Sequence, residues 1–556
     1  MPPRSAKVPA KVVAEPNWLR PIIIALGALL LIAYTSTEVS DPDAWWHLKT
    51  GQYMLQQHRL PWPDPFSYTT LMGKAAYPGE EQTRYFNLTH EWLAQVILYG
   101  SYALGGYAGL ILFRAAMLTG FCALMGVAVY ARVRSFWAAV IAAFLAASTA
   151  CQFTADRPYL FTFVFLGATV AILEWRRGMW FLPAIFAIWA NAHGGFFMGW
   201  VVLGAYCGEA LFLRLRGKPP EGEKQLWLVA IASILASGLN PNSFRVIPVM
   251  IAYRKSIMQA TLWEWQYPAP WPPSPFITLL IGAVAVMIWA RRRTRPRDWL
   301  LLATLGPAAM LAVRNIFLAA LVGPLLIVSY IPWNWKLPRV AEYAAAFLLL
   351  AFTTMRVAEG DAFQLRAADW KYPAAAADFI QQHHITGRMF NTYEIGGYLV
   401  WRVAPELKTF IDGRALNEAV YFDYQRIAFN AEAQNGKSGE ELLRDYGIDL
   451  IVMDGFEYNT GKPYLLPAAL SDPSQKEWKL VYQDAQAVIY MKNPPPGVQP
   501  LNNFDALASF EQQCQQYVDH SGGQTACTAG LAHLFQTIGD TARAQRWRMI
   551  AAQYGR

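Results

Sequence analysis

Acidic side chains and an imidazole stand close together in the polar stretch 38–92, which follows the first apolar run of the chain. Asp41 and Asp43 are separated by one residue, and His47 comes one helical turn later. Such a group can hold a divalent cation, or one carboxylate can take a proton from an acceptor hydroxyl. Either acid could instead cap the helix that follows, which would leave the other acid free. The pattern therefore indicates a binding or catalytic site in this stretch.

Two further motifs carry charge at the ends of apolar runs. His90 and Glu91 open a short apolar helix and could join the acidic site or contact a polar substrate, although capping of that helix is the structural alternative. Asp156 and Arg157 stand before a proline, which is a common first residue of a helix. Asp156 is a candidate ligand of a metal or a polar substrate and Arg157 a candidate partner of an anion, and a local ion pair is the alternative.

Three more side chains lie beside apolar runs. His193 precedes two glycines, which permit close approach of the backbone, so it is a candidate substrate-binding residue. Arg314 suits a phosphate group because a guanidinium group matches phosphate oxygens with two hydrogen bonds, although it could also extend to the membrane interface. Glu264 lies between two tryptophans, a pattern more typical of an interfacial anchor than of a ligand.

The composition indicates a polytopic membrane protein. Of 556 residues 54% are hydrophobic and 15% charged, against about 25% charged in soluble domains. The net charge of +8 comes from basic clusters between apolar runs, where cytoplasmic loops carry them. This distribution argues against a nucleic-acid partner. No cleavage site follows the first apolar run, so we expect that run to stay as a membrane helix.

Eleven membrane spans account for the basic clusters. With a cytoplasmic leader at 1–17, every strongly basic cluster lies inside, provided that the short helix 91–104 lies along the interface and Gly105-Gly106 ends it. The candidate site residues then share the outer face, where polar groups at membrane depth are usually functional. The expected spans are approximately 18–36, 108–130, 136–150, 159–173, 180–190, 196–213, 225–237, 276–290, 299–313, 316–330 and 343–354.

The chain divides into a transmembrane domain at 18–358, with the large outer loop 38–92, an extracytoplasmic α/β domain at 359–493 and a tetratricopeptide-like helical tail at 497–556. Cys514 and Cys527 in the tail could pair if it is extracytoplasmic. In the α/β domain the pattern predicts strands at 398–403, 408–411 and 449–453, a helix at 440–446, a hairpin at 478–492, and tight turns at 396–398 and 411–414.

The outer loop resembles that of a known enzyme superfamily. The run Asp43-Ala-Trp-Trp-His47-Leu-Lys, then Gly51, then the segment from His58 to Tyr68, is similar to the first outer loop of GT-C glycosyltransferases, especially the oligosaccharyltransferase catalytic subunit. The resemblance implies a polytopic helical fold with an extracytoplasmic C-terminal domain and a polyprenyl-phosphate sugar as donor. It also implies that Asp43, just past the first membrane helix, lies at the reaction centre.

We therefore expect an inverting membrane glycosyltransferase of the bacterial inner membrane, with Asp43 as general base or, with Asp156, as ligand of Mg²⁺ or Mn²⁺. The acceptor would be an extracytoplasmic glycan, lipid or protein. Two alternatives are a non-catalytic scaffold, whose helical tail binds an envelope protein, and a lipid-linked saccharide transporter. The expected substrate-binding residues are Asp41, His47, His90, Glu91, Arg157, His193 and Arg314.

Overall fold

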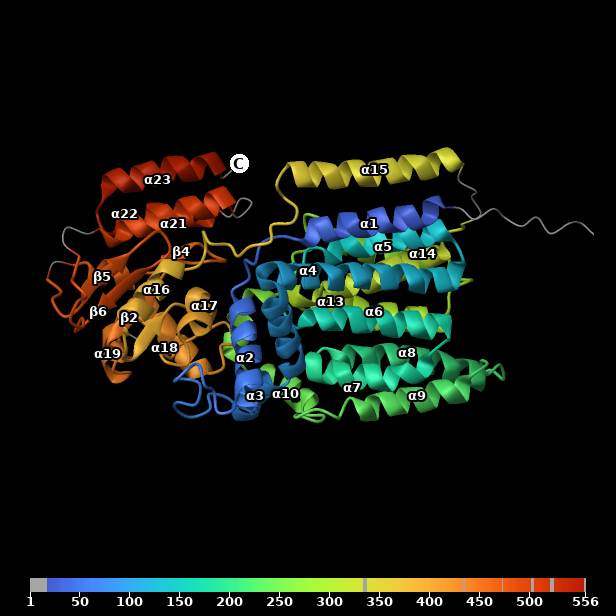
Figure 1. The fold of residues 1–556 in the computed structure, drawn as a ribbon. Coiled ribbons are helices and arrows are strands. Elements are labelled where there is room, and N and C mark those ends of the chain that lie inside the picture. The colour runs from blue at the N-terminus through green and yellow to red at the C-terminus, as the bar shows by residue number, and fades with distance from the viewer. Residues whose placement is uncertain are drawn as a thin grey trace, which may run out of the picture.

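A computed structural model describes residues 18–333, 338–433, 436–472, 474–501, 505–520 and 525–554. A bundle of roughly parallel helices adjoins a smaller domain that holds all the strands of the described chain, and α2 (Asp43–Gln57) lies crosswise between them (Figure 1). The expected leader at 1–17 lies outside the described residues.

The bundle is built from apolar helices. Within the described part of the chain, four helical segments are long and apolar enough to cross a membrane, and they are Glu80–Val133, Phe196–Leu215, Val313–Tyr330 and Arg339–Ala358. The bundle helices are α1 (Leu19–Thr35), α4 (Trp92–Val133), α5 (Phe136–Ala150), α6 (Tyr159–Trp175), α7 (Leu182–Ala192), α8 (Phe196–Leu215), α9 (Glu223–Ala236), α12 (Pro275–Trp289), α13 (Pro296–Met310), α14 (Phe317–Tyr330) and α15 (Arg339–Ala358).

Short helices lie in the connections of the bundle. Besides α2, they are α3 (Glu80–Thr89), α10 (Val246–Tyr253), α11 (Ile257–Thr261) and the 3₁₀ turns η1 (Met179–Phe181), η2 (Trp263–Trp265) and η3 (Val313–Asn315). Helix α3 was missed in the sequence, where the whole stretch 38–92 reads as one loop. Glu80 and Arg84 explain why α3 is stable there, because their side chains pair one turn apart at 3.0 Å in a buried position.

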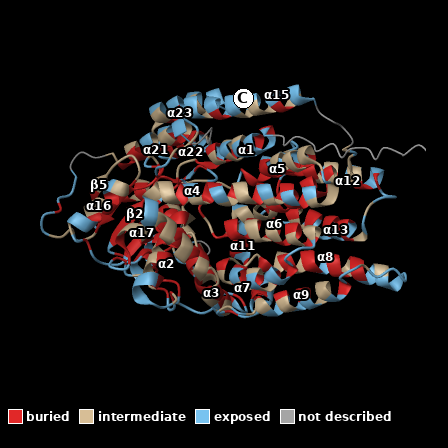
Figure 2. Cartoon of the chain, turned by 45° about the vertical axis from the view of Figure 1, so that its right-hand side comes forward, coloured by how far each residue is buried: buried red, intermediate tan, exposed pale blue. Residues whose placement is uncertain are grey.

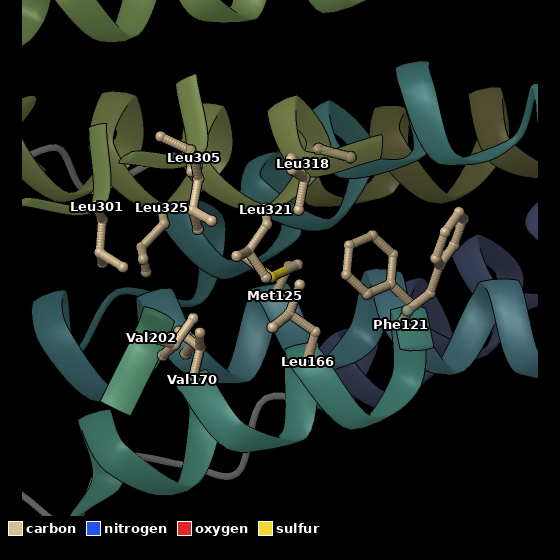
Figure 3. Close-up of a cluster of buried hydrophobic side chains, with 14 of the residues drawn as sticks. Phe121, Met125, Leu166, Val170, Val202, Leu301, Leu305, Leu318, Leu321 and Leu325 are labelled. Atoms are coloured by element: carbon tan, nitrogen blue, oxygen red, sulfur yellow. The ribbon is translucent and has the colours of Figure 1, made fainter. Parts of the chain in front are cut away.

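The centre of the bundle is a continuous apolar core. Side chains from α4, α6, α8, α13 and α14 meet there, including Met125, Leu166 and Leu321 (Figure 3). Figure 2 shows buried residues concentrated inside the bundle, while α15 is largely exposed. Only 11% of the most apolar window of α15 is buried. An exposed apolar helix of this kind is suited to contact with lipid rather than water.

Helix α4 contains the expected break. Gly105 and Gly106 have non-helical backbone angles, and Gly106 has a φ of 58°. A side chain at Gly109 would meet the carbonyl oxygen of Ser101 at 2.3 Å, so the two halves of α4 approach each other closely at the break. The chain before Gly105 therefore runs crosswise beside α2, and the chain after it enters the bundle (Figure 1).

Basic residues gather where α4 and α6 end. Arg132 lies 2.6 Å from Glu174 and 2.8 Å from Asp298, and Arg297 lies 2.9 Å from Glu174. Glu174 is at the end of α6, while Arg157 precedes the start of the same helix. The ion-pair cluster and the candidate site therefore lie at opposite ends of the bundle. A cavity of about 330 Å³ beside Arg297 belongs to this far end.

The C-terminal domain has a four-stranded sheet of order β1-β2-β6-β5, in which β1 and β2 are parallel and the other neighbours antiparallel. A two-stranded sheet joins β3 and β4. The strands are β1 (Met389–Asn391), β2 (Leu450–Met453), β3 (Phe456–Glu457), β4 (Lys462–Pro463), β5 (Lys479–Gln483) and β6 (Val488–Met491). The helices are α16 (Ala374–Gln382), α17 (Tyr393–Val403), α18 (Glu418–Ala428), α19 (Gly439–Asp445) and α20 (Leu466–Leu470).

Several predictions for this domain are confirmed and three are wrong. The strand at 449–453, the hairpin at 478–492, the helix at 440–446 and a turn at Gly413-Arg414 are present. The stretch 398–403 is helix α17 rather than a strand, and 408–411 forms only an isolated bridge through Thr409. The glycines at 396 and 397 lie inside α17 and do not make a turn.

The tail forms the three expected helices, α21 (Ala506–His520), α22 (Ala526–Thr537) and α23 (Thr541–Tyr554). Cys514 and Cys527 are joined by a disulfide bond between the first two. Phe456 and Phe510 belong to one apolar cluster, which packs the tail against the α/β domain.

Backbone hydrogen bonds attach the outer loop to the C-terminal domain. The amide of Val39 donates to Arg366, and Val39 accepts from the amide of Ala368, both at 3.0 Å. Further along the loop, the amide of Thr409 donates to the carbonyl of Phe66 at 3.0 Å. The loop is therefore held between the bundle and the C-terminal domain.

Candidate active site

Arg157 binds both aspartates of the outer loop. Its Nε and one terminal nitrogen donate to the two carboxylate oxygens of Asp41 at 2.9 and 2.8 Å. Its other terminal nitrogen lies 2.8 Å from Oδ2 of Asp43. Arg157 comes from the α5–α6 connection, Asp41 from the α1–α2 connection and Asp43 from the first position of α2. The guanidinium group therefore ties two outer connections together at the carboxylates.

Of the two aspartates, Asp41 caps the helix that follows, and the carboxylate of Asp43 stays free of capping. Oδ1 of Asp41 accepts a hydrogen bond from the amide of Asp43 at 2.8 Å, and the carbonyl of Asp41 accepts from the amide of Ala44. Asp41 thus stabilises the start of α2 and fixes Arg157. The carboxylate of Asp43, the first residue of α2, takes no part in capping that helix.

Glu264 links the two arginines. One carboxylate oxygen lies 3.5 Å from Arg157, and the other lies 3.4 Å from Arg314. The guanidinium group of Arg314 also lies over the ring of Trp265, 4.6 Å from its centre. Glu264 is therefore part of the site rather than only an interfacial anchor, and it connects the acidic group to a second arginine.

Three imidazoles surround the carboxylate of Glu91. Its oxygens lie 3.2 Å from Nε2 of His90, 3.6 Å from Nε2 of His193 and 4.0 Å from Nδ1 of His47. These residues come from the ends of α3 and α7 and from α2, so three elements converge on Glu91. The convergence makes a second polar group beside the aspartates.

The orientation of His193 is fixed by its neighbours. Its Nδ1 accepts a hydrogen bond from the amide of Gly195 at 3.1 Å and lies 2.6 Å from the hydroxyl of Thr162. The indole N–H of Trp189 donates to that hydroxyl. Because Nδ1 accepts, the proton of a neutral His193 lies on Nε2, which faces Glu91. These hydrogen bonds therefore fix the orientation and the tautomer of the His193 imidazole.

Burial changes the protonation of the site. Burial raises the pKa of Asp43 to about 6; the charge of Asp41 adds to the rise, and Arg157 opposes it. Burial would also raise the pKa of Asp41, but Arg157 holds it below its ordinary value. Burial lowers the pKa of His47 to about 3 and that of His193 to about 4, so both are neutral near pH 7. Asp43 is thus the carboxyl group that titrates closest to neutrality among these residues.

The C-terminal domain covers Asp43. A side chain at Gly413 would have its Cβ 1.8 Å from Oδ1 of Asp43, so only glycine permits this approach. The carbonyl of Gly413 accepts a hydrogen bond from the hydroxyl of Tyr393 at 3.0 Å. Arg414 and Asp412, which the sequence assigned to a turn, pair with each other at 2.6 Å, and Arg414 also lies 3.1 Å from Asp64. The turn therefore contacts the outer loop beside Asp43.

Asp156 faces away from this group of carboxylates. Its Oδ2 lies 2.7 Å from Arg114, a fully buried residue of α4. The same arginine donates to the backbone carbonyl of Thr35, which ends α1. Asp156 therefore has a structural partner that joins three connections, and its expected role with Asp43 as a metal ligand stays a prediction.

The donor set does not fit a divalent cation. Within the described residues, no group of three or more His, Cys, Asp or Glu side chains is arranged to hold a metal ion. Both oxygens of Asp41 and one oxygen of Asp43 already bind Arg157. Mg²⁺ and Ca²⁺ need several free oxygen ligands at 2.0–2.6 Å. The expected Mg²⁺ or Mn²⁺ has no such set at Asp43.

The structure brings most of the predicted residues together, and four neighbouring residues were not recognised in the sequence. Asp41, Asp43, Arg157, Arg314 and the histidine group around Glu91 lie at one end of the bundle, and their roles stay predictions. The roles of Glu264, Gly413, Tyr393 and Arg114 were not recognised. Arg114 carried a signal, because a lone charge inside an apolar helix requires a partner. No local pattern around Gly413 reveals that the turn reaches α2.

Solved structures with a similar fold are oligosaccharyltransferases. The apo enzyme from Archaeoglobus fulgidus superposes with a TM-score of 0.53 and 13% identity over 88% of this chain and 76% of that chain. The AglB oligosaccharyltransferase of the same organism, in complex with an inhibitory peptide and a dolichol-phosphate, gives a TM-score of 0.53 and 13% identity over 87% and 75%. No protein-family model matches the chain, and no curated protein matches it.

The fold therefore resembles that of these oligosaccharyltransferases. The resemblance expected from the outer loop is confirmed at the level of the fold over most of the chain. At 13% identity this likeness defines a fold and not an activity. The activity has to be argued from the group of side chains around Asp43.

Proposed function

We propose that this protein is an inverting GT-C-type glycosyltransferase that moves a sugar from a polyprenyl-phosphate donor to an extracytoplasmic acceptor. The single observation that carries the proposal is the carboxyl group of Asp43. It lies at the end of an oligosaccharyltransferase-like bundle, burial raises its pKa to about 6, and Gly413 of the C-terminal domain covers it. A general base works best with a pKa near the operating pH.

In the proposed reaction, a nucleophilic O–H or N–H group of the acceptor attacks the anomeric carbon of the donor sugar. The bond from that carbon to the phosphate oxygen breaks, and the polyprenyl phosphate leaves with the electron pair. Asp43 takes the proton of the nucleophile. Attack from the side opposite the phosphate inverts the anomeric centre. The carboxylate, freed from helix capping, is available for this proton transfer.

The charges around Asp43 suit a phosphate leaving group. Arg314 keeps a side chain that is 37% exposed, and its loose contact with Glu264 leaves guanidinium N–H groups for phosphate oxygens. His90 and His193, which contact Glu91, could hydrogen-bond to the sugar or phosphate. The lipid tail would lie between bundle helices. The dolichol-phosphate in the AglB complex supports a lipid-linked donor for this fold.

The proposal also covers the orientation of the protein in the membrane, its acceptor and its protein partner. The basic cluster at the end of the bundle opposite Asp43 supports a cytoplasmic position for that end, with the site and the C-terminal domain outside a bacterial inner membrane. The acceptor is a glycan, a lipid or a secreted protein. The tail helices could bind an envelope protein partner. Mg²⁺ or Mn²⁺ is not part of this proposal, because Arg157 uses the oxygens that would bind it.

The test replaces Asp43 with Asn in the native host and compares surface glycans and secreted-protein glycosylation by mass spectrometry. We expect the modification that disappears on gene deletion to disappear also in Asp43→Asn, at equal protein level in the membrane. Asp378→Asn is the matched control, because Asp378 pairs with Arg402 in the C-terminal domain, at a half-exposed position away from the bundle. The control strain should keep the wild-type glycans.

Other results separate the alternatives. An unchanged glycan profile in Asp43→Asn, when deletion does change it, would refute Asp43 as the base. If deletion leaves every glycan unchanged, the scaffold and the lipid-linked saccharide transporter move ahead of the transferase. A transporter would show the lipid-linked sugar accumulating on one membrane face in the deletion strain.

A further inference from the structure

We infer that Arg157 is a built-in cation that takes the place of a divalent metal at the carboxylates of this site. The inference deepens the proposed function, and its catalytic half rests on that function. Its other half, the absence of a divalent-cation site at Asp43 in the wild-type protein, can be tested without any sugar substrate.

The guanidinium group of Arg157 lies where an ion would have to bind. Its three nitrogens face three carboxylates, with 2.9 and 2.8 Å to Asp41, 2.8 Å to Asp43 and 3.5 Å to Glu264. The two short contacts to Asp41 are the paired geometry in which arginine binds carboxylate most strongly. A metal ion could reach these oxygens only after Arg157 had left.

The balance of charges around Arg157 also argues against a divalent cation at this site. Asp41, Asp43 and Glu264 bring three negative charges within reach of one guanidinium group, and Arg314 supplies a second positive charge on the far side of Glu264. The two arginines therefore neutralise most of the acidic group. The group keeps one net negative charge, so the two arginines remove most of the attraction that a divalent cation would otherwise find there.

No spare acid completes a metal site around Arg157. Asp156, the next residue along the chain toward the N-terminus, is tied to the fully buried Arg114 at 2.7 Å. Glu91 is occupied by three imidazoles. Among the described residues, these two neighbouring carboxylates are thus already bound by other side chains.

Arg157 can perform the electrostatic work of a cation during transfer. Three of its five N–H groups bind Asp41 and Asp43, and its side chain remains 25% exposed at the site. A remaining N–H can therefore reach a phosphate oxygen of the donor. A fixed positive charge beside the leaving phosphate stabilises the negative charge that develops there.

The test measures Mn²⁺ binding by electron paramagnetic resonance on the purified full-length protein in detergent. We expect no saturable Mn²⁺ site that depends on Asp43 in the wild-type protein, so that wild type and Asp43→Asn give the same titration. We expect Arg157→Ala to gain a site at least about 100-fold tighter, because removing one nearby charge changes ion binding by orders of magnitude. Adding Asp43→Asn to Arg157→Ala should abolish that new site.

Arg157→Lys is the matched control. It keeps the positive charge among the carboxylates, so it should bind Mn²⁺ no more tightly than the wild type does. A wild-type site that weakens in Asp43→Asn would overturn the inference. A variant Arg157→Ala that folds, judged by its elution from size-exclusion chromatography, and gains no site would also overturn it. If Arg157→Ala does not fold, the comparison of wild type with Asp43→Asn decides alone.

The part of the inference that concerns catalysis is tested by a separate measurement of sugar transfer. Membranes washed with EDTA should transfer sugar at the wild-type rate, and Arg157→Ala membranes should lose at least about 100-fold. Activity that EDTA abolishes and Mn²⁺ restores would overturn the inference while supporting the transferase. If no transfer is found in any strain, the proposed function fails, and the Mn²⁺ titration still decides whether Arg157 replaces a metal.

Discussion

Opposing effects set the pKa of Asp43. Burial and the charge of Asp41 favour the neutral carboxyl group, while Arg157, 2.8 Å away, favours the ionised one. The result is a pKa of about 6, above the ordinary value for an aspartate. Such a group is ionised at neutral pH and yet basic enough to accept a proton during the reaction. His47 and His193 remain neutral over the same range because burial lowers the pKa of each.

The pH dependence of transfer should follow Asp43. Because the base must be ionised, the rate should reach a plateau above about pH 7 and fall about tenfold per pH unit below pH 6. The neutral histidines should add no second step between pH 5 and 8. The measurement is kcat/KM against pH in membranes, with the donor that the glycan comparison identifies. A rate independent of pH from 4.5 to 7 would contradict the assignment of Asp43.

At the scale of elements, close packing between α17, the 411–414 turn and the start of α2 builds the site. A side chain at Gly397 would meet the carbonyl of Pro42 at 2.3 Å, and one at Gly396 would meet the carbonyl of Ile411 at 2.2 Å. Both glycines lie in α17, which packs between the outer loop and the 411–414 turn. They are needed for contact between elements and not for a change of chain direction.

Gly413→Ala tests this packing. The backbone of Gly413 is outside the left-handed region, so alanine costs no backbone strain, and its effect should come from the contact with Asp43. We expect at least a tenfold loss of glycan transfer, because a misplaced catalytic group costs rate steeply. Gly120→Ala is the control, because no atom lies within 4 Å of a Cβ at Gly120. Equal activity in the two variants, measured at equal protein level, would contradict the contact.

Elements with a local sequence pattern were predicted correctly. Predictions were wrong or missing where contacts between distant parts of the chain determine the structure. The apolar helices, the break at Gly105-Gly106 and the hairpin at 478–492 followed from periodicity and turn residues. Tyr398 to Val403 was read as a strand because aromatic and branched residues favour strands, but burial against α2 makes the segment helical. The pairing of Asp156 with Arg114 could not be foreseen, because Arg114 lies 42 residues away and gives no local sign of it.

At the scale of the whole molecule, charge is sorted between the two ends of the bundle. The acidic and histidine groups lie at the end that faces the C-terminal domain, and Arg132 and Arg297 pair with Glu174 at the other. Helices α4 and α6 run from one group to the other. The disulfide of the tail fits this arrangement, because disulfides persist in oxidising compartments outside the cytoplasm.

Removing the disulfide should loosen the tail and leave the site intact. Closing a loop of this length contributes about 3 kcal/mol to stability. Cys514→Ser with Cys527→Ser should therefore make the tail helices sensitive to protease at a concentration that leaves the wild type uncut. Cys207→Ser, in the bundle helix α8, is the control. Thiol labelling of intact cells should find Cys514 and Cys527 oxidised; free thiols at both positions would contradict an extracytoplasmic tail.

The contact between Gly413 and Asp43 also has a consequence for the order in which the protein is made. The two residues are 370 positions apart, and everything between them has to be synthesised and inserted before the turn can close over the carboxylate. A ribosome-bound chain that has threaded its first helices therefore presents Asp43 without its cover. The group of side chains around Asp43 is complete only after the C-terminal domain has folded onto α2, so an unfinished chain lacks the assembled site that the proposed transfer needs.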